Sequence, residues 1–457
     1  MNLLVDQYFE SLVGKRIAVL GIGVSNRPLI RMLLERGMHV LACDKTPREQ
    51  LDKEVLDLEQ AGAVLHVGEG YLEQVQADIV FRTPGMHPDI PALRQLRAQG
   101  ACITSEMEAF FEVCPCRIIA VTGSDGKTTT TTLIAKILEH AGHRVWLGGN
   151  IGQPLLPLAA EMTPTDIAVV ELSSFQLMTM QRAAEVAVVT NLAPNHLDIH
   201  KDMAEYVQAK KNVFLQQSEG ARLVLNYDND LTRGFAAEAK GEVLFFSRKT
   251  AVQRGVYLAD GQLFCNGKPL MPAADIRIPG IHNVENYMAA ACAVQGLATD
   301  ADIDAVARSF AGVEHRIEFV REKDGVRYYN DSIASSPTRT IAGLHAFDQK
   351  LVLIAGGYDK KLPFDTLGPE ICAHVRLLIL CGATAAKIEA AVCAAPAYTT
   401  GAPVILHAQT LRDAVQLAAQ NAVCGDIVTL SPACAAFDQF KNFMVRGETY
   451  KQLVQAL

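Results

Sequence analysis

The stretch 118–130, with the sequence IIAVTGSDGKTTT, decides how the centre of this chain folds. Apolar residues at its start predict a buried strand, its two glycines predict a tight turn, and an amphipathic helical pattern follows at once. Backbone N–H groups at the start of such a helix point toward an anion, and the helix dipole favours negative charge there. The stretch therefore predicts a phosphate-binding loop between a strand and a helix.

The side chains of this loop suit a nucleotide. Gly123 and Gly126 would let the backbone approach a phosphate closely. Lys127 would bridge the β- and γ-phosphates, and the Thr128 hydroxyl would coordinate Mg²⁺. Val121 stands where the full eight-residue pattern has its first glycine, so the motif is a shortened GxxGKT. A coincidental turn is the structural alternative, and the flanking strand and helix disfavour it.

Short apolar runs alternate with helical patterns along the whole chain. The predicted strands are Ile17–Leu20, Val40–Cys43, Ile79–Phe81, Ile118–Val121, Ile167–Val170, Val186–Val189, Val326–Tyr329, Leu351–Ile354, Leu377–Leu380, Val404–Leu406 and Ile427–Leu430. Continuous apolar strands separated by helices are typical of parallel sheets covered by helices on both faces. We therefore expect an α/β protein of three consecutive domains, each with a mainly parallel sheet.

The three expected domains are a Rossmann-like N-terminal domain over residues 1–110, a P-loop ATPase-like central domain over 111–312 and a Rossmann-like C-terminal domain over 313–457. The length of 457 residues agrees with three domains of about 150 residues each. Residues 222–280 carry shorter, more β-rich pieces, and we expect them to form a small side sheet.

Composition excludes several classes of protein. Hydrophobic residues make up 49% of the chain, so we do not expect global disorder. The net charge is −8, whereas a chain that neutralises nucleic-acid phosphates is normally basic, so nucleic acid is a disfavoured partner. The 11 cysteines are scattered, which is typical of reduced thiols in a cytoplasmic protein. We expect no secretory signal at the N-terminus. No apolar run approaches the ~20 residues of a membrane helix, so we expect no membrane span.

Polar residues follow two later strands of the central domain. Glu171 ends one apolar run, and His196 and His200 follow the next. Ligands of open α/β sheets bind beyond the carboxyl ends of the strands. Glu171 is therefore a candidate Mg²⁺ ligand, with a solvated strand end as its alternative. The two histidines, four residues apart, could hold a transition metal, although an ordinary exposed or hydrogen-bonded histidine is commoner.

A partial dinucleotide-binding pattern follows the first strand. Gly21 and Gly23 occupy two of its glycine positions, and Asn26 replaces the third. Asp44 ends the next strand about 20 residues further on, as a ribose-binding acid would. A purely structural turn explains these residues equally well.

Taken in order, the motifs of this chain resemble those of the Mur ligases, and the resemblance covers essentially the whole length. The motifs are Gly123–Thr129, Asn150–Gly152, Glu171–Leu177, Asn191 with His196 and Asp198, Ala209–Lys210, His282–Asn283, His315–Arg316, Asn330–Ser332, Leu430–Ala435 and Asp438–Phe443. The last of these, followed by Arg446 and Gly447, most resembles the D-glutamate-adding type of this family.

The resemblance implies an ATP-dependent amide ligase that works through an acyl phosphate, releases ADP and phosphate, and serves peptidoglycan precursor synthesis in the cytoplasm. It implies ATP as co-substrate and two Mg²⁺ ions. The implied ATP-binding residues are Gly123, Ser124, Asp125, Gly126, Lys127, Thr128, Thr129, Asn283, Arg316 and Asp331. The implied metal ligands are Thr128, Glu171, His196 and Lys210, the last as a carbamate. Lys127, Glu171, His196 and Lys210 would be the catalytic residues.

The resemblance also implies the remaining partners, UDP-N-acetylmuramoyl-L-alanine and D-glutamate, and a monomeric protein. The implied contacts to the UDP-linked substrate are Val24, Ser25, Lys45, Thr83, Gly85, Asn150 and His196. Those to the amino acid are Ser335, Lys360, Ala436 and Phe443. The chain departs from the family pattern at Ile333, where lysine is usual, and at Ala436, where serine is usual. These departures leave D- against L-glutamate open.

Three alternatives to this interpretation remain. The chain could be another Mur-type ligase or a folylpolyglutamate synthase, which share the chemistry and differ in substrate. It could also be a non-catalytic nucleotide-binding module or regulatory NTPase. The chemistry-bearing residues Lys127, Thr128, Glu171, His196 and Lys210 are all present, which argues against a non-catalytic relative.

Overall fold

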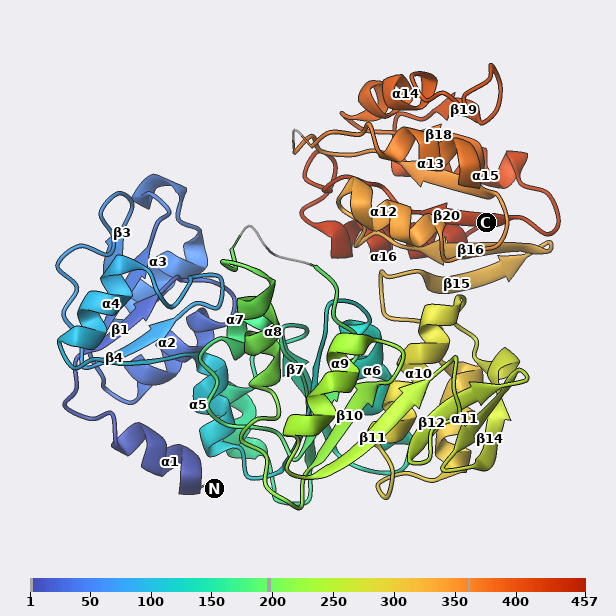
Figure 1. Ribbon diagram of the computed structural model, residues 1–457. Coiled ribbons are helices and arrows are strands. Elements are labelled where there is room, and N and C mark those ends of the chain that lie inside the picture. The colour runs from blue at the N-terminus through green and yellow to red at the C-terminus, as the bar shows by residue number, and fades with distance from the viewer. Residues whose placement is uncertain (1–2, 195–198, 361) are drawn as a thin grey trace. The chain divides into compact units, whose positions relative to one another are not determined.

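The structure is a computed structural model that describes residues 3–194, 199–360 and 362–457. Its strands form three sheets, which can be followed in Figure 1 by colour, from blue through green to orange and red. The chain divides into two compact units. The first comprises Met1–Asp275 and Val284–Arg308, and the second comprises Ile276–Asn283 and Ser309–Leu457. The first unit holds two of the sheets.

The first sheet has five parallel strands in the order β3-β2-β1-β4-β5. Its strands are β1 (Ile17–Leu20), β2 (Val40–Asp44), β3 (Val64–Val67), β4 (Ile79–Arg82) and β5 (Cys102–Thr104). The helices of this part are α1 (Leu3–Glu10), α2 (Asn26–Glu35), the 3-10 helix η1 (Arg48–Gln50), α3 (Lys53–Gln60), α4 (Pro91–Ala98) and α5 (Glu106–Val113).

Both faces of this sheet are buried because side chains of a strand alternate between them. Ile17 and Val19 of β1 pack in one core cluster with apolar residues of α2, α3 and α5. Ala18 and Leu20 pack in another with Leu93 of α4. A four-residue apolar run thus predicts a strand buried on both sides, as expected for this part of the chain.

The central sheet has nine strands in the order β14-β13-β12-β11-β10-β9-β6-β8-β7, and only the pairs of β13 with its two neighbours are antiparallel. Its strands are β6 (Arg117–Thr122), β7 (Val145–Gly149), β8 (Ile167–Glu171), β9 (Val186–Val189), β10 (Arg222–Asn226), β11 (Glu242–Ser247), β12 (Gly255–Ala259), β13 (Gln262–Cys265) and β14 (Lys268–Pro272). The helices are α6 (Lys127–His140), η2 (Leu156–Glu161), α7 (Ser174–Leu177), α8 (Met203–Lys211), α9 (Asp230–Gly234), η3 (Phe235–Glu238), η4 (Ala273–Asp275), α10 (Ile281–Ala293) and α11 (Asp300–Ser309).

The expected side sheet over residues 222–280 is wrong. Strand β10 pairs in parallel with β9, so β10 to β14 extend the central sheet and no separate sheet forms. The short strands of this region suggested a separate sheet. However, any strand that supplies N–H and C=O groups can extend the open edge of a parallel sheet.

The third sheet has six strands in the order β15-β16-β20-β17-β18-β19, and only the pair of β15 with β16 is antiparallel. Its strands are β15 (Glu318–Lys323), β16 (Val326–Asn330), β17 (Leu351–Ala355), β18 (Val375–Leu380), β19 (Val404–His407) and β20 (Ile427–Leu430). Its helices are α12 (Pro337–Leu344), α13 (Leu367–His374), α14 (Ala385–Cys393), α15 (Leu411–Asn421) and α16 (Phe443–Gln455).

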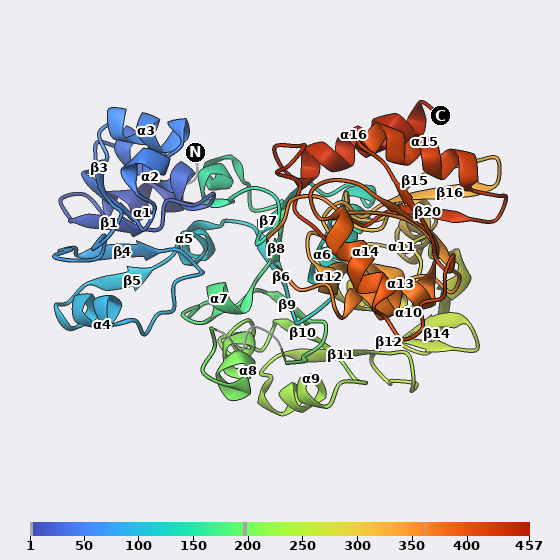
Figure 2. The same ribbon diagram turned by 90° about the horizontal axis from the view of Figure 1, so that it is seen from above.

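Two helix layers cover the third sheet. One core cluster joins the sheet to Leu344 of α12, Ile371 of α13 and Ile388 of α14. The other joins it to Ala414 of α15 and Tyr450 of α16. Figure 2 shows α15 and α16 together on one side of this sheet. The expected class of three α/β domains with mostly parallel sheets is confirmed, while the boundaries after residues 110 and 312 stay predictions.

The sequence patterns missed the less apolar strands. Strands β3, β5, β7 and β15 lie next to the predicted strands at or near sheet edges, where part of each strand stays exposed and the apolar run is shorter. No helix in the described part of the chain is long and apolar enough to cross a membrane.

Candidate active site

The glycine turn between β6 and α6 has the backbone geometry of a phosphate loop. Gly123 has φ 145° and Gly126, which caps α6, has φ 77°. A Cβ at Gly123 would lie 2.0 Å from Thr190 Oγ1, and one at Gly126 would lie 2.2 Å from Asn286 Oδ1. Both positions therefore require glycine, and the backbone N–H groups of the first helical turn point out of the sheet edge.

The residues that follow β9 hold this loop in place. The Thr190 hydroxyl donates to the Asp125 carbonyl at 2.5 Å, and Asn191 Oδ1 accepts the Asp125 N–H at 2.9 Å. The Ser124 hydroxyl donates to the carbonyl of Ala193 at 2.9 Å. Sequence reasoning gave Thr190 no role; the signal that could have found it is a polar residue directly after an apolar strand beside the loop.

Two lysines converge on the loop. Lys127 Nζ donates to the carbonyls of Gly123 at 3.0 Å and Ser124 at 2.8 Å. Lys210 Nζ, from the last turn of α8, donates to the same Gly123 carbonyl and to Thr122 Oγ1, both at 2.9 Å. The structure therefore brings two amines that lie far apart in the sequence to one carbonyl of the phosphate loop.

Lys210 is the more unusual of the two because its side chain is buried. Only 2% of the residue is exposed, and its ammonium lies 5.4 Å from the centre of the Tyr206 ring. Burial, and next to it the charge of Lys127, lowers the pKa of Lys210 well below its usual value, although Glu171 and Asp125 oppose this. The lowered pKa favours the neutral form of the amine, and a neutral amine is a nucleophile.

Glu171 ends β8 directly beside the loop strand, with Glu171 opposite Val121 in the register. It is 1% exposed, and its Oε1 accepts the side-chain N–H of Asn150 at 2.7 Å. Within the part of the chain that the structure describes, its buried Oε2 has no hydrogen-bond partner. A buried carboxylate oxygen needs a partner. With the Thr128 hydroxyl it offers the hard oxygen donors that suit Mg²⁺, so the residues present fit such an ion.

His196 lies outside the described residues, and with it the expected pair with His200. His200 itself is buried, and its Nε2 lies 2.9 Å from Ser174 Oγ. Its ring stacks on Phe175, with centroids 5.4 Å apart, and meets Tyr206 edge-on. These contacts pack α8 against α7.

The predicted contacts to a UDP-linked substrate follow three neighbouring strands of the first sheet. Val24 and Ser25 follow β1, Lys45 follows β2, and Thr83 and Gly85 follow β4. The Thr83 N–H donates to the Leu20 carbonyl at 2.8 Å, so the loops after β1 and β4 touch. Val24 is 76% exposed at the tip of its loop.

Asp44, the candidate ribose-binding acid, has a structural role. Its two carboxylate oxygens accept the N–H groups of Ile22 at 2.7 Å and Thr46 at 2.9 Å. Burial alone would raise the pKa of Asp44, but these hydrogen bonds outweigh it and hold the pKa below its usual value. The carboxylate thus ties the first glycine turn to the end of β2, in line with the structural alternative.

The second unit holds the other predicted nucleotide residues. Asn283 donates from its side chain to the Pro279 carbonyl at 2.5 Å. Arg316 lies in a turn between His315 and Ile317, both with positive φ. Asp331 is buried, accepts the Ser431 hydroxyl at 2.7 Å and the Ile317 N–H at 3.3 Å, and feels the charge of Arg316. Burial raises the pKa of Asp331 to about 7 despite these partners.

The predicted amino-acid residues follow adjacent strands of the third sheet. Ser335 follows β16, Ala436 follows β20 and Lys360 follows β17, three neighbours in the sheet. Lys360 is exposed, whereas Ala436 is 2% exposed and offers no side-chain donor. Phe443 begins α16 and its ring centroid lies 6.0 Å from that of His315. The four residues thus share one edge of the sheet.

Arg446 organises this edge, and sequence reasoning assigned it no role. Its buried guanidinium donates to Ser332 Oγ at 3.0 Å and to the carbonyls of Ser332, Cys434 and Ala435 at 2.9–3.1 Å. Ser332 in turn donates to the Phe443 carbonyl at 2.8 Å. Burial lowers the pKa of Arg446 to about 10, so it keeps its charge at neutral pH. The signal that could have found it is an arginine directly after the apolar residues 443–445 at the start of α16.

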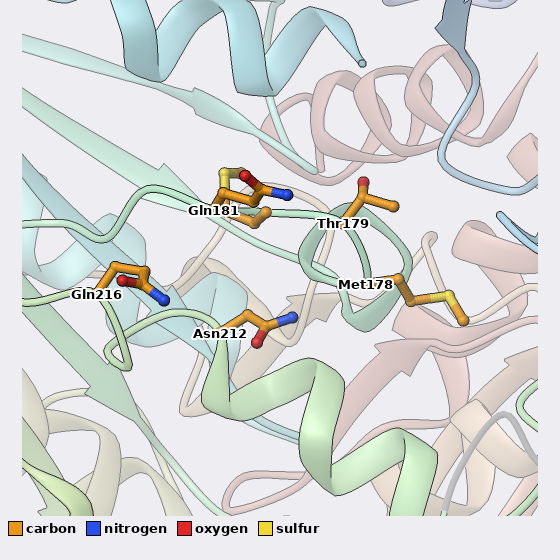
Figure 3. A pocket seen from close by; sticks show the side chains of 6 residues that line it. Met178, Thr179, Gln181, Asn212 and Gln216 are labelled. Atoms are coloured by element: carbon orange, nitrogen blue, oxygen red, sulfur yellow. The ribbon is translucent and has the colours of Figure 1, made fainter. Parts of the chain in front are cut away.

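A pocket of about 420 Å³ opens beside α7 and α8, and Figure 3 shows the side chains around it. It is lined by Met178, Thr179, Met180, Gln181, Asn212 and Gln216. None of these is a predicted site residue, and Asn212 is engaged through a hydrogen bond to the Leu177 carbonyl at 2.8 Å. The pocket therefore adds no group to the candidate site.

Comparison with known families and proteins gives full-length matches. The Mur ligase middle domain matches residues 121–294, and the Mur ligase glutamate ligase domain matches residues 315–434. A UDP-N-acetylmuramoylalanine--D-glutamate ligase of Acetivibrio thermocellus is 51% identical over 464 residues, covering 100% of both chains. One of Clostridium botulinum is 50% identical and covers 99% of both chains.

Solved structures agree on the fold. The UDP-N-acetylmuramate-alanine ligase of Thermotoga maritima has a TM-score of 0.59 at 16% identity, and the comparison covers 97% of this chain and 99% of that one. A UDP-N-acetylmuramoyl-L-alanyl-D-glutamate--2,6-diaminopimelate ligase has a TM-score of 0.57 at 18% identity, with 92% and 93% covered. The three-sheet architecture is therefore shared with known ligase structures.

Proposed function

Because the chain belongs to the Mur ligase family, we propose that it is an ATP-dependent ligase that joins D-glutamate to UDP-N-acetylmuramoyl-L-alanine in the cytoplasm, for peptidoglycan synthesis. The single observation that carries the chemistry is the cluster around the glycine turn. There Lys127 and Lys210 meet at one carbonyl, and a buried carboxylate oxygen of Glu171 has no hydrogen-bond partner among the residues that the structure describes. Such a site suits the triphosphate end of ATP with its metal ion.

The first step activates the substrate carboxylate. A carboxylate is a poor electrophile because its charge repels an amine and oxide is a poor leaving group. Its oxygen attacks the γ-phosphorus of ATP, the bond to the β-phosphate oxygen breaks, and an acyl phosphate and ADP result. Lys127 and the N–H groups at the start of α6 stabilise the charge on the transferred phosphoryl group.

Magnesium ions, two in this proposal, would neutralise phosphate charge when bound. Thr128, Glu171, His196 and a carbamate on Lys210 would hold them. The carbamate forms when the neutral amine of Lys210 attacks carbon dioxide and loses a proton, which turns an amine into an anionic oxygen donor. The burial of Lys210 supports this because it favours the neutral amine.

The second step forms the amide. The neutral amine of glutamate attacks the acyl carbon, a tetrahedral intermediate collapses, and inorganic phosphate leaves with the electrons of the broken C–O bond. The amine loses a proton in this step, so a base near it is required. Ser335, Lys360, Ala436 and Phe443 would hold the amino acid, and Val24, Ser25, Lys45, Thr83, Gly85 and Asn150 the UDP-linked substrate. The protein would act as a monomer of three domains over residues 1–110, 111–312 and 313–457.

The test is a coupled phosphate-release assay with ATP, Mg²⁺ and UDP-N-acetylmuramoyl-L-alanine against each glutamate enantiomer. We expect phosphate only when the nucleotide substrate and D-glutamate are both present. Release with L-glutamate instead would assign Ile333 and Ala436 a different stereochemical preference. Release with another UDP-linked acid or a folate would place the chain with the other ligases, and ATP hydrolysis without any acceptor would make it a nucleotide-binding or regulatory NTPase.

A further inference from the structure

Two histidines and a glutamate of the third domain meet at the ends of two helices. His345 Nε2 lies 2.6 Å from Glu370 Oε2, and His374 Nε2 lies 3.6 Å from the same oxygen. One ligand atom of each residue lies within 4.8 Å of those of the other two. The histidine ring centroids are 4.7 Å apart. The ligase mechanism uses none of these residues.

The helices fix this arrangement. His345 is the C-cap of α12, and Glu370 and His374 are four residues apart on α13, so they share one face of that helix. One core cluster contains Leu344, which is next to His345, together with Leu367 and Ile371, which lie near Glu370 in the sequence. The backbones that carry the three side chains are therefore held by buried apolar contacts, while the side chains reach solvent.

The spacing suits a small divalent ion. Ligand atoms at about 2.1 Å from a tetrahedral zinc ion are about 3.4 Å apart. The two separations from Glu370, 2.6 and 3.6 Å, and the third, which is at most 4.8 Å, differ from this by less than about 1.5 Å, which side-chain rotations can supply. His345 is 53% exposed at its side chain and the other two are about one third exposed, so all can adjust and solvent can reach the ion.

The charges around the cluster also favour a cation. The glutamate supplies one negative charge to the two imidazoles. Both histidines sit at helix C-termini, where the unsatisfied carbonyl groups carry partial negative charge. Two imidazole nitrogens and one carboxylate oxygen form a donor set that selects borderline transition-metal ions over Mg²⁺, which prefers oxygen alone.

We propose that His345, Glu370 and His374 bind a transition-metal dication of the zinc type, with water in the remaining position, and that this ion clamps the C-terminal end of α12 to that of α13. Without an ion, the carboxylate of Glu370 is shared between the imidazole rings of His345 and His374. The proposal is independent of the ligase reaction.

The experiment uses the full chain, free of affinity tags, treated with a chelator and kept reduced. Excess Mg²⁺ occupies sites that prefer oxygen donors. Co²⁺, followed by its visible absorption, and Zn²⁺, followed by calorimetry, are titrated into the parent and into His345→Asn, His374→Gln and Glu370→Gln. His407→Asn is the matched control, because His407 lies in the same domain and, among the described residues, pairs with a single carboxylate, that of Glu389, at 3.2 Å.

We expect the parent and the control to bind one equivalent more than each of the three variants, or to bind that equivalent at least about tenfold more tightly. Zn²⁺ should raise the thermal midpoint of the parent and leave those of the variants unchanged, since a ligand bound only by the folded state stabilises it. Equal thermal midpoints of all forms in the absence of metal show that the variants fold. Equal stoichiometry and affinity in the parent and the three folded variants, or binding to the parent weaker than about 1 mM, overturns the proposal.

Discussion

At the scale of single residues, the carbonyl of Gly123 is the point where the candidate active site comes together. It accepts hydrogen bonds from Lys127, four residues away, and from Lys210, 87 residues away. A carbonyl contacted by two ammonium groups is strongly polarised, and burial makes the proximity of the two cations costly. This electrostatic cost is avoided if one of the two amines is neutral or is modified.

Lys127→Ala removes the cation nearest the transferred phosphate. We expect kcat/KM for ligation to fall roughly a hundredfold or more. This corresponds to a rise of about 3 kcal/mol in the activation free energy, as when other preorganised charges are lost at a transition state. The phosphate-release assay measures this. Lys136→Ala, on an exposed turn of the same helix and paired with Glu139 at 2.8 Å, is the control and should keep its activity. Near-wild-type turnover of Lys127→Ala would exclude the loop from the reaction.

Lys210→Ala removes the proposed carbamate. We expect no ligation in this variant and partial recovery on addition of a small carboxylate such as acetate, because the added anion can take the place of the lost oxygen donor. The matched control is Lys211→Ala, since Lys211 is next in the sequence but pairs with Glu238 at 2.5 Å. A fully active Lys210→Ala would contradict the carbamate, as would incorporation of ¹³C-bicarbonate that persists in Lys210→Arg.

At the scale of elements, the junction of α5 and η2 carries a buried acid. Glu106 is the first residue of α5, is 4% exposed, and accepts the Leu156 N–H at 3.0 Å. Burial raises the pKa of Glu106 to about 7 from an ordinary 4.5, although the backbone hydrogen bonds oppose this. An N-terminal position favours the anion, but the apolar packing of α5 outweighs it.

The free energy of unfolding should therefore depend on pH through Glu106. A carboxyl whose pKa is raised in the folded state stabilises fully below the unfolded pKa of 4.5, and this contribution is lost as the pH rises through about 7. The loss amounts to roughly 3 kcal/mol by pH 8. Glu106→Gln should match the wild type at pH 4 and exceed its stability at pH 8.

The single tryptophan, Trp146, lies in the same unit and reports unfolding by fluorescence. Glu112→Gln, on an exposed position of the same helix, is the control and should follow the wild type at every pH. An identical pH dependence for wild type and Glu106→Gln would mean that the carboxyl of Glu106 does not titrate in this range.

At the scale of the molecule, Arg82 links the two sheets of the first unit. It ends β4 of the first sheet, is fully buried, and donates to the Met86 carbonyl at 2.8 Å. Its other nitrogen donates to the Phe175 carbonyl and to Thr179 Oγ1 beside the central sheet, both at 3.0 Å. Burial lowers the pKa of Arg82, with Glu108 opposing this. One guanidinium thus binds carbonyl groups in the loop after β4 and in α7, which belong to the parts of the unit that hold the first and the central sheet.

Arg82→Met keeps most of the apolar length and removes every donor. We expect the unit to lose about 2–3 kcal/mol of unfolding free energy, because the carbonyls of Met86 and Phe175 lose the hydrogen bonds that Arg82 donates. Denaturant unfolding followed through Trp146 measures this. Arg94→Met on the exposed face of α4 should leave the midpoint unchanged. If both variants unfold at the same denaturant concentration as the wild type, the link between the sheets is energetically unimportant.

The sequence by itself determined the elements whose signals are local. The apolar run before Gly123, the glycine turn and the helix after Lys127 are neighbours in the chain, so their pattern predicts strand, loop and helix. The order of motifs likewise indicated the family. Glu171 could be named as a candidate because the carboxyl ends of parallel strands share one edge.

Tertiary structure alone decided the contacts between distant segments. Nothing in the residues around Lys210 predicts that its ammonium meets the Gly123 carbonyl, and no local pattern places Asn286 against Gly126. The joining of β10 to the central sheet and the burial of Arg82 and Arg446 also depend on which surfaces meet. The reason is physical: periodicity and turn chemistry act over a few residues, whereas burial and long-range hydrogen bonds exist only once the whole chain has packed.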